Sequence, residues 1–334
     1  MAPTLEVRNL VKHYPTRGGV VSAVEDVSFE VAPGETLGLV GESGSGKTTL
    51  ATTALRLAEP TAGTVLFEGE DVFALSGEGL GRFRRAAQLV FQDPYSSLDP
   101  RMNLRQLVAE PLAVQRVGDR ASRVARVDEL LELVGLSPRF AGHYAHQFSG
   151  GQRQRIVIAR ALALRPRLLV CDEPVSALDV SIRAQILNLL KGLQRELGLT
   201  YLFIAHDFSV IRYVSDRIAV MYLGKLVEIG GREAVLGDPR HPYTQALLSS
   251  VRRADPDHRP ERIVLRGDVP SAIDPPPGCR FHTRCPIAEA VCAVEEPPLR
   301  VVGGSRRAAC HFAEDSRERM LAAQARVSER ASRA

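Results

Sequence analysis

The sequence has no tryptophan, and aromatic residues make up only 5% of its 334 positions. Proteins that bind single-stranded nucleic acid stack the bases on aromatic side chains and gather Lys and Arg on one face. Here the net charge is only +4, and the basic residues are spread along the chain. The composition therefore predicts no nucleic-acid partner.

A long apolar run is also missing. No stretch approaches the roughly 18 to 20 apolar residues that a membrane-spanning helix needs. The first residues, MAPTLEVRNLVKHY, contain neither the apolar core nor the cleavage site of a secretory signal. With 45% hydrophobic and 25% charged residues, the composition is that of an ordinary globular protein. We therefore expect an intracellular, water-soluble chain.

Cysteine is scarce and unevenly placed. Four of the five cysteines lie after Gly278, in the pattern Cys279-x5-Cys285-x6-Cys292-x17-Cys310. None of these spacings is the C-x2-C pair of zinc ribbons or bacterial ferredoxins, so the spacing alone selects no metal. Four thiolates can fold an irregular, proline-rich segment around a metal centre. Unrelated free thiols and, less favoured in a cytosolic protein, a disulfide framework are the alternatives.

Apolar runs and helical periodicity alternate along most of the chain. Short apolar runs bounded by turn residues predict buried strands at 35–40, 167–174 and 200–207. Helical patterns between them are clearest at 47–58, 150–164 and 181–197. Alternation of this kind predicts an α/β fold with a mainly parallel sheet that helices cover on both faces.

The same patterns divide the chain into parts. We expect residues 1–237 to form one domain, with an inserted helical subdomain at about 95–164 and a closing hairpin at 216–230. Beyond residue 237 the sequence is rich in Pro and Arg and leads into the cysteines, which predicts a small irregular region over 238–315. The charged, Ala-rich residues 316–334 predict a flexible tail or a frayed helix.

The segment GESGSGKT, residues 41–48, lies between a predicted strand and a predicted helix and fits the P-loop pattern. Glycines let the backbone wrap around phosphate oxygens, and the start of the helix adds a positive dipole end. Lys47 supplies a cation for the β- and γ-phosphates, and Thr48 a hydroxyl for Mg²⁺. The alternative is a Gly- and Ser-rich turn that matches by accident. The predicted nucleotide-binding residues are Gly41, Ser43, Gly44, Gly46, Lys47, Thr48 and Thr49.

Two acidic residues end the apolar run LLVCDEP. Asp172 lies at the C-terminal end of the predicted strand, where its carboxylate can hold Mg²⁺, either directly or through water. Glu173 is the candidate for polarising the attacking water. An ordinary acidic strand end is the alternative, and the presence of the P-loop weakens it.

The segment FSGGQRQR opens a predicted helix and carries Ser149, Gly150, Gly151 and Gln152. With this segment, the sequence resembles the nucleotide-binding subunits of ATP-binding-cassette (ABC) transporters, although Phe148 replaces the leading Leu of their signature motif. Further motifs stand in the order of that family: Tyr14 as the aromatic that stacks on adenine, Gln92 as the Q-loop, Asp179 in the D-loop SALD, and His206 as the switch histidine.

The resemblance implies a role for each motif. The implied catalytic residues are Glu173, Gln92 and His206, and Mg²⁺ is held by Thr48, Gln92 and Asp172. In this family two cassettes bury two ATPs in a head-to-tail dimer, so the signature, Ser149 to Gln152, contacts the ATP of the partner subunit. Because the chain has one cassette, we expect it to require a second ABC ATPase subunit.

Four segments narrow the resemblance to the oligopeptide/dipeptide importer branch, closest to the second of its paired ATPase subunits: VFQDPYSSLDPRMNL, HQFSGGQRQR, HPYTQALLSSV and PPGCRFHTRCP. The branch implies a paralogous partner in a heterodimer, two transmembrane permease subunits and an extracytoplasmic peptide-binding protein. It places the chain at the cytoplasmic face of the cell membrane. An importer of nickel or another small solute is the alternative. A soluble ABC protein of DNA repair or translation is less favoured, because such proteins usually carry paired cassettes or long insertions.

The peptide-importer branch also implies a [4Fe-4S] cluster at Cys279, Cys285, Cys292 and Cys310, with zinc as the runner-up. Nothing in ATP hydrolysis needs electrons. The resemblance therefore implies a structural or sensing role for this metal centre.

Overall fold

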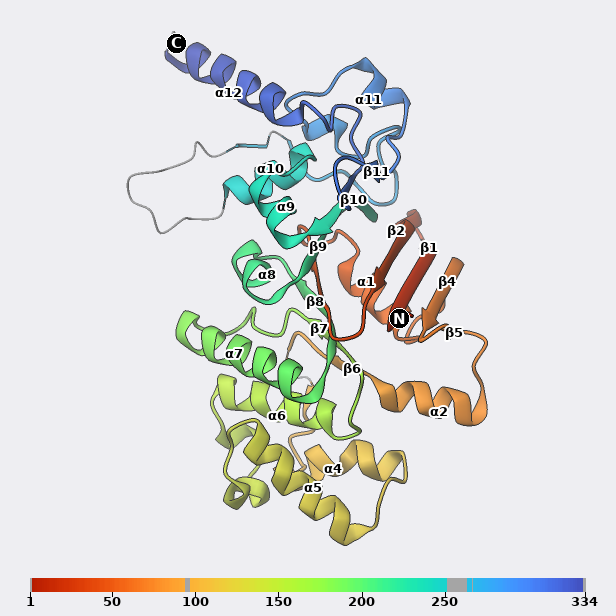
Figure 1. Ribbon diagram of the computed structural model, residues 1–334, viewed down its shortest axis with the longest axis vertical. Coiled ribbons are helices and arrows are strands. Elements are labelled where there is room, and N and C mark those ends of the chain that lie inside the picture. The colour runs from red at the N-terminus through yellow and green to blue at the C-terminus, as the bar shows by residue number, and fades with distance from the viewer. Residues whose placement is uncertain (1, 94–96, 251–262, 266, 333–334) are drawn as a thin grey trace.

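The computed structural model describes residues 2–93, 97–250, 263–265 and 267–332, with the side chains of the last helix included as far as residue 326. The predicted start of the helical subdomain near residue 95 and most of the segment before residue 263 lie outside the described residues. Two sheets lie next to each other, and helices flank the larger one (Figure 1).

The larger sheet has eight strands in the order β11-β12-β10-β9-β3-β8-β7-β6. Its parallel part comprises β6 (Ala87–Val90), β7 (Leu168–Asp172), β8 (Thr200–Ala205), β3 (Thr36–Val40) and β9 (Arg217–Tyr222). From β9 the chain turns back as antiparallel β10 (Lys225–Gly231), which is the predicted hairpin. The mainly parallel α/β sheet expected from the sequence is confirmed.

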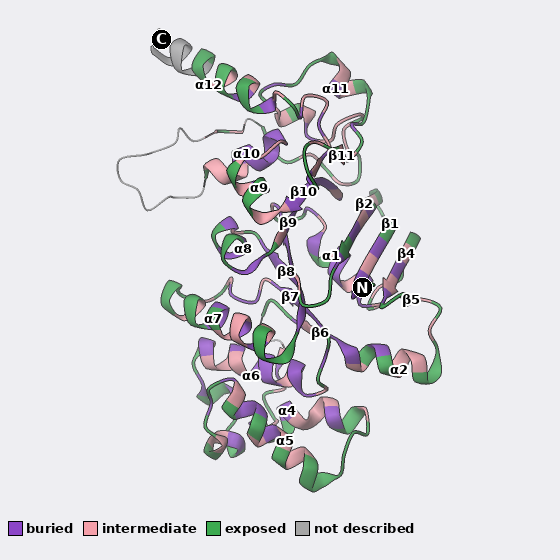
Figure 2. Cartoon of the chain, viewed as in Figure 1, coloured by how far each residue is buried: buried purple, intermediate pink, exposed green. Residues whose placement is uncertain are grey.

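The central strands are buried on both faces, which explains their nearly continuous apolar sequences. Every residue of β3, β7 and β8 is buried. Strands β7 and β8 are correspondingly purple in Figure 2. Alternate side chains enter different cores because successive residues of a strand point to opposite faces. Leu202 and Ile204 of β8 belong to one core, whereas Tyr201, Phe203 and Ala205 belong to the other.

The smaller sheet is antiparallel, with strands in the order β2-β1-β4-β5. Its strands are β1 (Leu5–Thr16), β2 (Gly19–Val31), β4 (Ala62–Phe67) and β5 (Glu70–Asp71). Its buried face shares a core with the larger sheet and with α1 (Lys47–Ala54), the helix that follows the glycine-rich loop. Helix α2 (Gly77–Ala86) leads from this sheet into β6.

The described part of the predicted helical subdomain is helical. It contains α4 (Leu104–Val114), α5 (Arg120–Leu133), the short 3-10 turns η1 (Pro138–Gly142) and η2 (Ala145–Gln147), and α6 (Gly150–Leu162). Side-chain caps begin α4 at Asn103, α5 at Asp119 and α6 at Ser149, each accepting a backbone N–H of the first turn. Helices α7 (Val180–Leu197) and α8 (Phe208–Val214) complete this side of the larger sheet.

The cysteine-bearing region joins the larger sheet. After α9 (Arg232–Gly237) and α10 (Pro242–Ser249), the described chain continues through η3 (His282–Arg284) and α11 (Ala290–Val294) to β11 (Arg300–Val301) and β12 (Arg307–Ala308). β12 pairs with β10, where Glu228 is opposite Ala308 and Ile229 is opposite Arg307. This region, expected to be irregular, thus adds two short strands to the edge of the sheet.

The last segment, for which a flexible tail or a frayed helix was expected, forms α12 (Ser316–Ser332). Its first turn is attached to the body of the protein. The Ser316 hydroxyl donates to Arg240 O at 2.8 Å and accepts from Gln245 Nε2 at 3.0 Å, and Met320 is buried.

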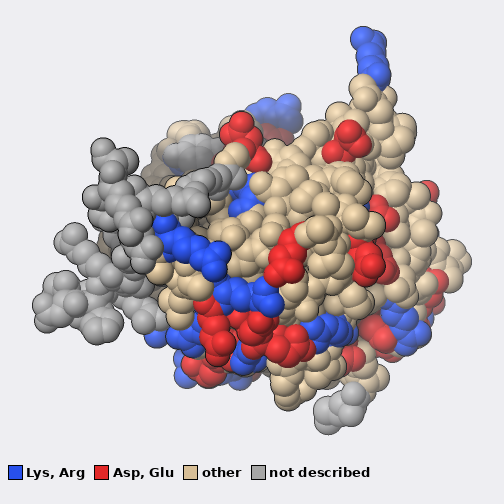
Figure 3. Space-filling view, turned by 90° about the horizontal axis from the view of Figure 1, so that it is seen from above, with Lys and Arg blue, Asp and Glu red and all other residues tan. Residues whose placement is uncertain are grey.

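Acidic and basic side chains lie interspersed on the face seen in Figure 3, which looks onto the C-terminal end of the molecule. Among the ion pairs of the C-terminal region, Asp238 pairs with Arg240 and Arg306, and Arg319 pairs with Asp315 and Glu289. Within the part of the chain that the structure describes, no helix is long and apolar enough to span a bilayer.

Candidate functional site

The glycine-rich loop connects the buried end of β3 to the start of α1. Lys47, the first residue of α1, is only 5% exposed, and its Nζ donates to Gly41 O at 2.8 Å and to Glu42 O at 2.9 Å. Burial lowers the pKa of the Lys47 ammonium, and the carboxylates of Glu173, Asp172 and Glu42 act in the opposite direction. The loop therefore curls around a partly desolvated cation at the N-terminus of a helix, an arrangement that suits a phosphate group.

Two positions of the loop accept only glycine. Gly46 has a φ of 99°, and a Cβ there would lie 2.1 Å from Ala23 O. At Gly41, a Cβ would lie 2.1 Å from Met221 O. Close packing of the loop between β2 and β9 therefore explains why the sequence has glycine at these two places.

Asp172 lies beside the loop at the end of β7. The carboxylate is buried, Thr48 hydrogen-bonds to it, and Oδ1 has no hydrogen-bond partner. Burial raises the pKa of Asp172, with Glu173 adding to this effect and Thr48 and Lys47 opposing it. A buried carboxylate oxygen without a partner next to a threonine hydroxyl is chemically suited to a Mg²⁺ ion or its bound water.

Glu173 meets the other two residues predicted to be catalytic. Its Oε2 accepts from Gln92 Nε2 at 3.2 Å and lies 2.9 Å from His206 Nδ1. The backbone of Glu173 has a φ of 46°, a conformation that is uncommon outside glycine and that turns the side chain away from the buried strand. Three residues from distant parts of the chain thus converge on one carboxylate.

Lys47, Thr48, Gln92, Glu173 and His206 line one open cleft of about 800 Å³, whereas Asp172 is not among the residues that line it. Tyr14 stands at its edge, 37% exposed, with the Lys12 ammonium 4.6 Å from the centroid of its ring. The described residues that line the cleft are Tyr14, Val21, Ala23, Glu42, Ser43, Gly44, Gly46, Lys47, Thr48, Thr49, Gln92, Glu173, His206, Leu247 and Ala272.

The segment Ser149 to Gln152 lies elsewhere, at the N-terminus of α6, and is not part of this lining. Ser149 and Gln152 form a reciprocal cap: Gln152 N donates to Ser149 Oγ at 3.3 Å, and Ser149 N donates to Gln152 Oε1 at 2.9 Å. At Gly151, a Cβ would lie 2.3 Å from Ile182 Cγ2 of α7. The geometry makes this helix start a second, separate surface with an exposed serine.

Asp179 caps α7. Its Oδ1 accepts from Ile182 N at 3.0 Å and from Ser181 Oγ at 2.8 Å, and the backbone hydrogen bond from Ile182 lowers the pKa of Asp179. Within this chain the D-loop aspartate therefore has a local role in starting a helix.

The four clustered cysteines surround one small buried cavity of about 10 Å³, which Phe281 and three histidines also line. All four thiols are free. Burial raises the pKa of Cys279 to about 11 and those of Cys285 and Cys310 to about 12. The fold thus brings these four side chains to one cavity, yet no three His, Cys, Asp or Glu side chains among the described residues are arranged to hold a metal ion.

Two of the neighbouring histidines have backbone partners. His282 Nδ1 lies 2.9 Å from Cys279 O, and His311 Nε2 lies 3.0 Å from Glu295 O. Because a carbonyl only accepts, each of these ring nitrogens is a donor.

Comparison with known proteins places these features in a family. A family model for "ABC transporter" matches residues 24–176, and a model for "Oligopeptide/dipeptide transporter, C-terminal region" matches residues 227–292. A putative peptide import ATP-binding protein of Brucella ovis is 53% identical over 308 residues, which cover 92% of this chain and 97% of that protein. The chain belongs to the ATP-binding subunits of ABC transporters. It is accordingly an ABC ATPase, as its motifs predict.

Two further comparisons extend the assignment to this family. The oligopeptide transport ATP-binding protein AppF of Bacillus subtilis is 52% identical to this ABC ATPase over 318 residues, covering 92% of this chain and 97% of that one. The solved dimeric ATP-binding cassette MJ0796, in a post-hydrolysis state bound to ADP and Pi, is 32% identical with a TM-score of 0.62. The match covers 68% of this chain and 98% of the MJ0796 chain.

Sequence reasoning missed five residues that line the cleft in this ABC ATPase: Val21, Ala23, Glu42, Leu247 and Ala272. Glu42 is a variable position within the P-loop pattern, Val21 and Ala23 lie on β2, and Leu247 and Ala272 come from the C-terminal region, outside the motifs assigned to nucleotide binding. Their place in the cleft follows from tertiary packing alone. A hydrophobic residue in α10 carried no signal that could have assigned it to the site.

Proposed function

We propose that this chain is the ATP-hydrolysing subunit of an importer for oligopeptides or dipeptides. The observation that carries the proposal is the convergence of Gln92, Glu173 and His206 in the same cleft as the buried Lys47. The match of residues 227–292 to the oligopeptide/dipeptide transporter C-terminal region, together with relatives named for peptide import, supports the peptide cargo. An importer of nickel or another small solute is the alternative.

Within this function, the phosphate end of the cleft has a defined chemistry. The backbone N–H groups of residues 41–49 and the Lys47 ammonium bind the phosphates, and the ring of Tyr14 stacks on the adenine. Thr48, Gln92 and Asp172 hold Mg²⁺, which supplies charge neutralisation between phosphate oxygens. This assignment accounts for the buried Asp172 oxygen that has no partner within the chain.

Glu173 orients and polarises the attacking water. Its carboxylate is the common partner of Gln92 and His206, so a displacement of either residue changes the position of the base. The side chain of His206 is 56% exposed, whereas that of Glu173 is 14% exposed. We assign to His206 the task of holding Glu173 in its working orientation.

The signature surface requires a partner subunit. Ser149 and the N–H groups that begin α6 form an anion-binding surface that does not face the cleft of the same chain. We propose that this surface covers the ATP held by a second, paralogous ATPase subunit, and that Asp179 lies at the contact between the two. The dimeric solved cassette bound to ADP and Pi supports this arrangement.

An apolar groove beside Gln92 suits the permease. It has a volume of about 430 Å³ and lies between α2, β6 and the helices α4 and α6. Leu57, Phe91 and Val114 line it with exposed fractions of 61%, 50% and 72%. We propose that this groove is a docking site for cytoplasmic helices of the two transmembrane permease subunits. Docking would place the chain at the cytoplasmic face of the membrane. A peptide-binding protein on the outer side would deliver the cargo. Because Phe91 directly precedes Gln92, docking is linked to the catalytic carboxylate.

The cysteine cavity is proposed to hold a [4Fe-4S] cluster, with zinc as the alternative. The donor set fits, because four thiols from Cys279, Cys285, Cys292 and Cys310 surround one buried space. Such a centre would cross-link η3, α11 and the segment after β12, and it would require the thiols to approach one another. Purification without oxygen, followed by assay of iron, acid-labile sulfide and zinc, tests this. About four irons and four sulfides per chain would indicate the cluster, and zinc alone would indicate a structural zinc site. If the protein contained neither iron nor zinc, the proposed metal centre would be disproved.

Transport with the permeases tests the proposed function. The chain would be co-expressed with its candidate permease subunits, purified with them and reconstituted in vesicles together with the binding protein. We expect ATP-dependent uptake of labelled di- and oligopeptides that excess unlabelled peptide suppresses. Uptake of Ni²⁺ without peptide uptake would favour the alternative cargo, and ATPase activity without association with any permease would contradict the importer.

A further inference from the structure

The C-terminal region reaches into the phosphate-binding loop from outside the cassette core. Glu42, the second residue of the loop, is held at two points. Its backbone N donates to Tyr243 Oη of α10 at 2.8 Å. Its carboxylate accepts two hydrogen bonds from Arg284 of η3, Nη1 to Oε2 at 2.8 Å and Nη2 to Oε1 at 3.2 Å.

Both contacts are built into the interior. Tyr243 is fully buried, and the Arg284 side chain is 8% exposed. Arg284 Nη1 also donates to Tyr222 Oη at 3.4 Å, and its guanidinium carbon lies 5.9 Å from the centroid of the Tyr222 ring. A two-point arginine–carboxylate pair fixes direction as well as distance, and partial burial strengthens it relative to a surface ion pair.

The residue that is held in this way also holds the catalytic cation. Lys47 Nζ donates to the backbone oxygen of Glu42 at 2.9 Å, and Ser45 N donates to the same oxygen at 3.2 Å. A shift of Glu42 therefore moves both the loop backbone and the ammonium. Misplacement of binding groups by about 1 Å can reduce a rate about 100-fold.

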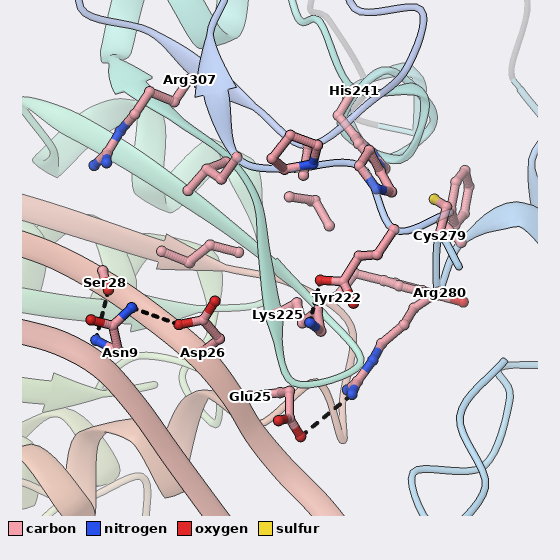
Figure 4. Close-up of a pocket in the computed structure, with 18 residues that line it drawn as sticks. Asn9, Glu25, Asp26, Ser28, Tyr222, Lys225, His241, Cys279, Arg280 and Arg307 are labelled. Carbon is pink, nitrogen blue, oxygen red and sulfur yellow. Dashed lines mark hydrogen bonds and ion pairs between the residues drawn. The ribbon is translucent and has the colours of Figure 1, made fainter. Parts of the chain in front are cut away.

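The C-terminal region is itself anchored to the core, so that it can hold the loop. Figure 4 shows the pocket of about 280 Å³ where it meets both sheets. Arg280 points from the C-terminal segment to Glu25 of β2, with 3.5 Å between Nη2 and Oε2, and Lys225 of β10 pairs with Glu296. A second contact joins this region to β2, where Ser22 N donates to Ala272 O at 2.9 Å.

We propose that Arg284 and Tyr243 are positioning residues of the nucleotide site, and that the C-terminal region sets ATP affinity by fixing Glu42 of the phosphate-binding loop. The inference rests on the proposed role of that loop in binding ATP. It assigns to the C-terminal region a part in the ATPase cycle in addition to any metal that it holds. Neither residue touches the nucleotide in this proposal, because both act through Glu42.

Equilibrium titration of the full-length chain with ATP tests the proposal. We expect Arg284→Ala to weaken ATP binding about tenfold, since the loop loses one of its two outer supports. Arg284→Lys should recover part of the loss, because an ammonium can make one of the two bonds but not the pair. Glu42→Gln should weaken binding to a similar extent, and the double variant should be no weaker than either single one, because both remove the same interaction.

Arg300→Ala is the matched control. Arg300 pairs through both terminal nitrogens with Glu314 within the same region, and neither residue lines the ATP cleft. The ATP affinity of Arg300→Ala should stay within about twofold of the wild-type value. Tyr243→Phe removes only the hydroxyl that accepts from Glu42 N, and it serves as the second probe if Arg284→Ala does not fold. If Tyr243→Phe bound ATP more weakly than the wild type but had the same melting temperature, the proposal would be supported by that variant as well.

Two results would overturn the proposal: an unchanged ATP affinity in folded Arg284→Ala, or losses that simply add in the double variant. Lys47→Ala separates these results from a failure of the proposed function. If the wild type and Lys47→Ala bind ATP equally, then the loop is not the phosphate site and the function fails. If Lys47→Ala loses affinity while Arg284→Ala and Tyr243→Phe keep it, only the positioning role fails.

Discussion

The ATP cleft and the cysteine cavity each gather several functional side chains in one place, but the two sites are preorganised to different degrees. In the cleft, Gln92 and His206 already lie within hydrogen-bond distance of Glu173. In the cavity, four free thiols line a space of about 10 Å³ without being arranged to hold a metal ion. Strand ends position the first group, whereas turns and short helices position the second. A site built on regular strands can therefore be preorganised without its ligand. A site built on irregular segments, in contrast, reaches its final geometry only when the ligand binds.

The largest effect should follow from Glu173→Gln, which tests whether the cleft is a preorganised catalytic site. We expect ATP turnover to fall about 1,000-fold, in the middle of the range for loss of a general base, while ATP binding persists. Phosphate release from the assembled transporter measures ATP turnover, and equilibrium titration measures ATP binding.

Glu78→Gln is the control for this variant, because Glu78 lies on α2 with 85% of its side chain exposed. Its turnover should match the wild type. If Glu173→Gln retained a tenth or more of the activity, the carboxylate would not be the base, and the convergence of Gln92 and His206 upon it would have another purpose.

Phe281→Ala addresses the other side of the comparison, namely what holds the cysteine region before any metal binds. Phe281 is 1% exposed, and its ring centroid lies 5.2 Å from that of Tyr222 and 5.4 Å from that of Tyr243. We expect the variant to lower the free energy of unfolding of the metal-free protein by about 3 kcal/mol. Denaturant unfolding measures this change.

Phe91→Ala provides the reference, because Phe91 is 50% exposed and its loss should change stability by no more than about 0.5 kcal/mol. An equally small effect at Phe281 would mean that the aromatic cluster does not stabilise the region. The thiols and their ligand would then have to supply the whole of its order.

The sequence predicted the strand-end residues of the cleft better than the contacts of the C-terminal region for a physical reason. The loop at residues 41–48, Asp172 and His206 each follow a buried strand, so local patterns locate them and the parallel sheet brings its strand ends together. Arg284 and Glu42, in contrast, are 242 positions apart, and Arg284 lies in a 3-10 turn that has no periodicity. Strands β11 and β12 are two residues long, which is too short for alternation to appear. Their pairing depends on tertiary contacts that a pattern cannot encode.

Lys47→Ala should have a smaller effect than the first two variants. The ammonium is buried in the loop, and one charge-assisted hydrogen bond from it to a phosphate oxygen would be worth about 2 kcal/mol, so ATP affinity should fall about 30-fold. Equilibrium titration with ATP measures the loss. Lys191→Ala is the control, since Lys191 on α7 donates only to Tyr213 O at the surface among the hydrogen bonds described for it. If Lys47→Ala bound ATP as tightly as the wild type, the ammonium would not bind the phosphates. The cleft would then have no more claim than the cysteine cavity to be a preorganised binding site.

The smallest effect should come from Tyr14→Ala, at the outer edge of the cleft. Stacking of a base on an aromatic ring contributes about 1–3 kcal/mol, and a ring that is 37% exposed should lie at the low end, so ATP should bind about fivefold more weakly. Tyr14→Phe keeps the ring and should bind ATP as the wild type does. Tripolyphosphate, which has no base, should bind equally to the wild type and to Tyr14→Ala but more weakly to Lys47→Ala. Equal losses of ATP and tripolyphosphate in Tyr14→Ala would show that the tyrosine supports the loop rather than the base. In that case the preorganised part of the cleft would extend along β1 to its outer edge.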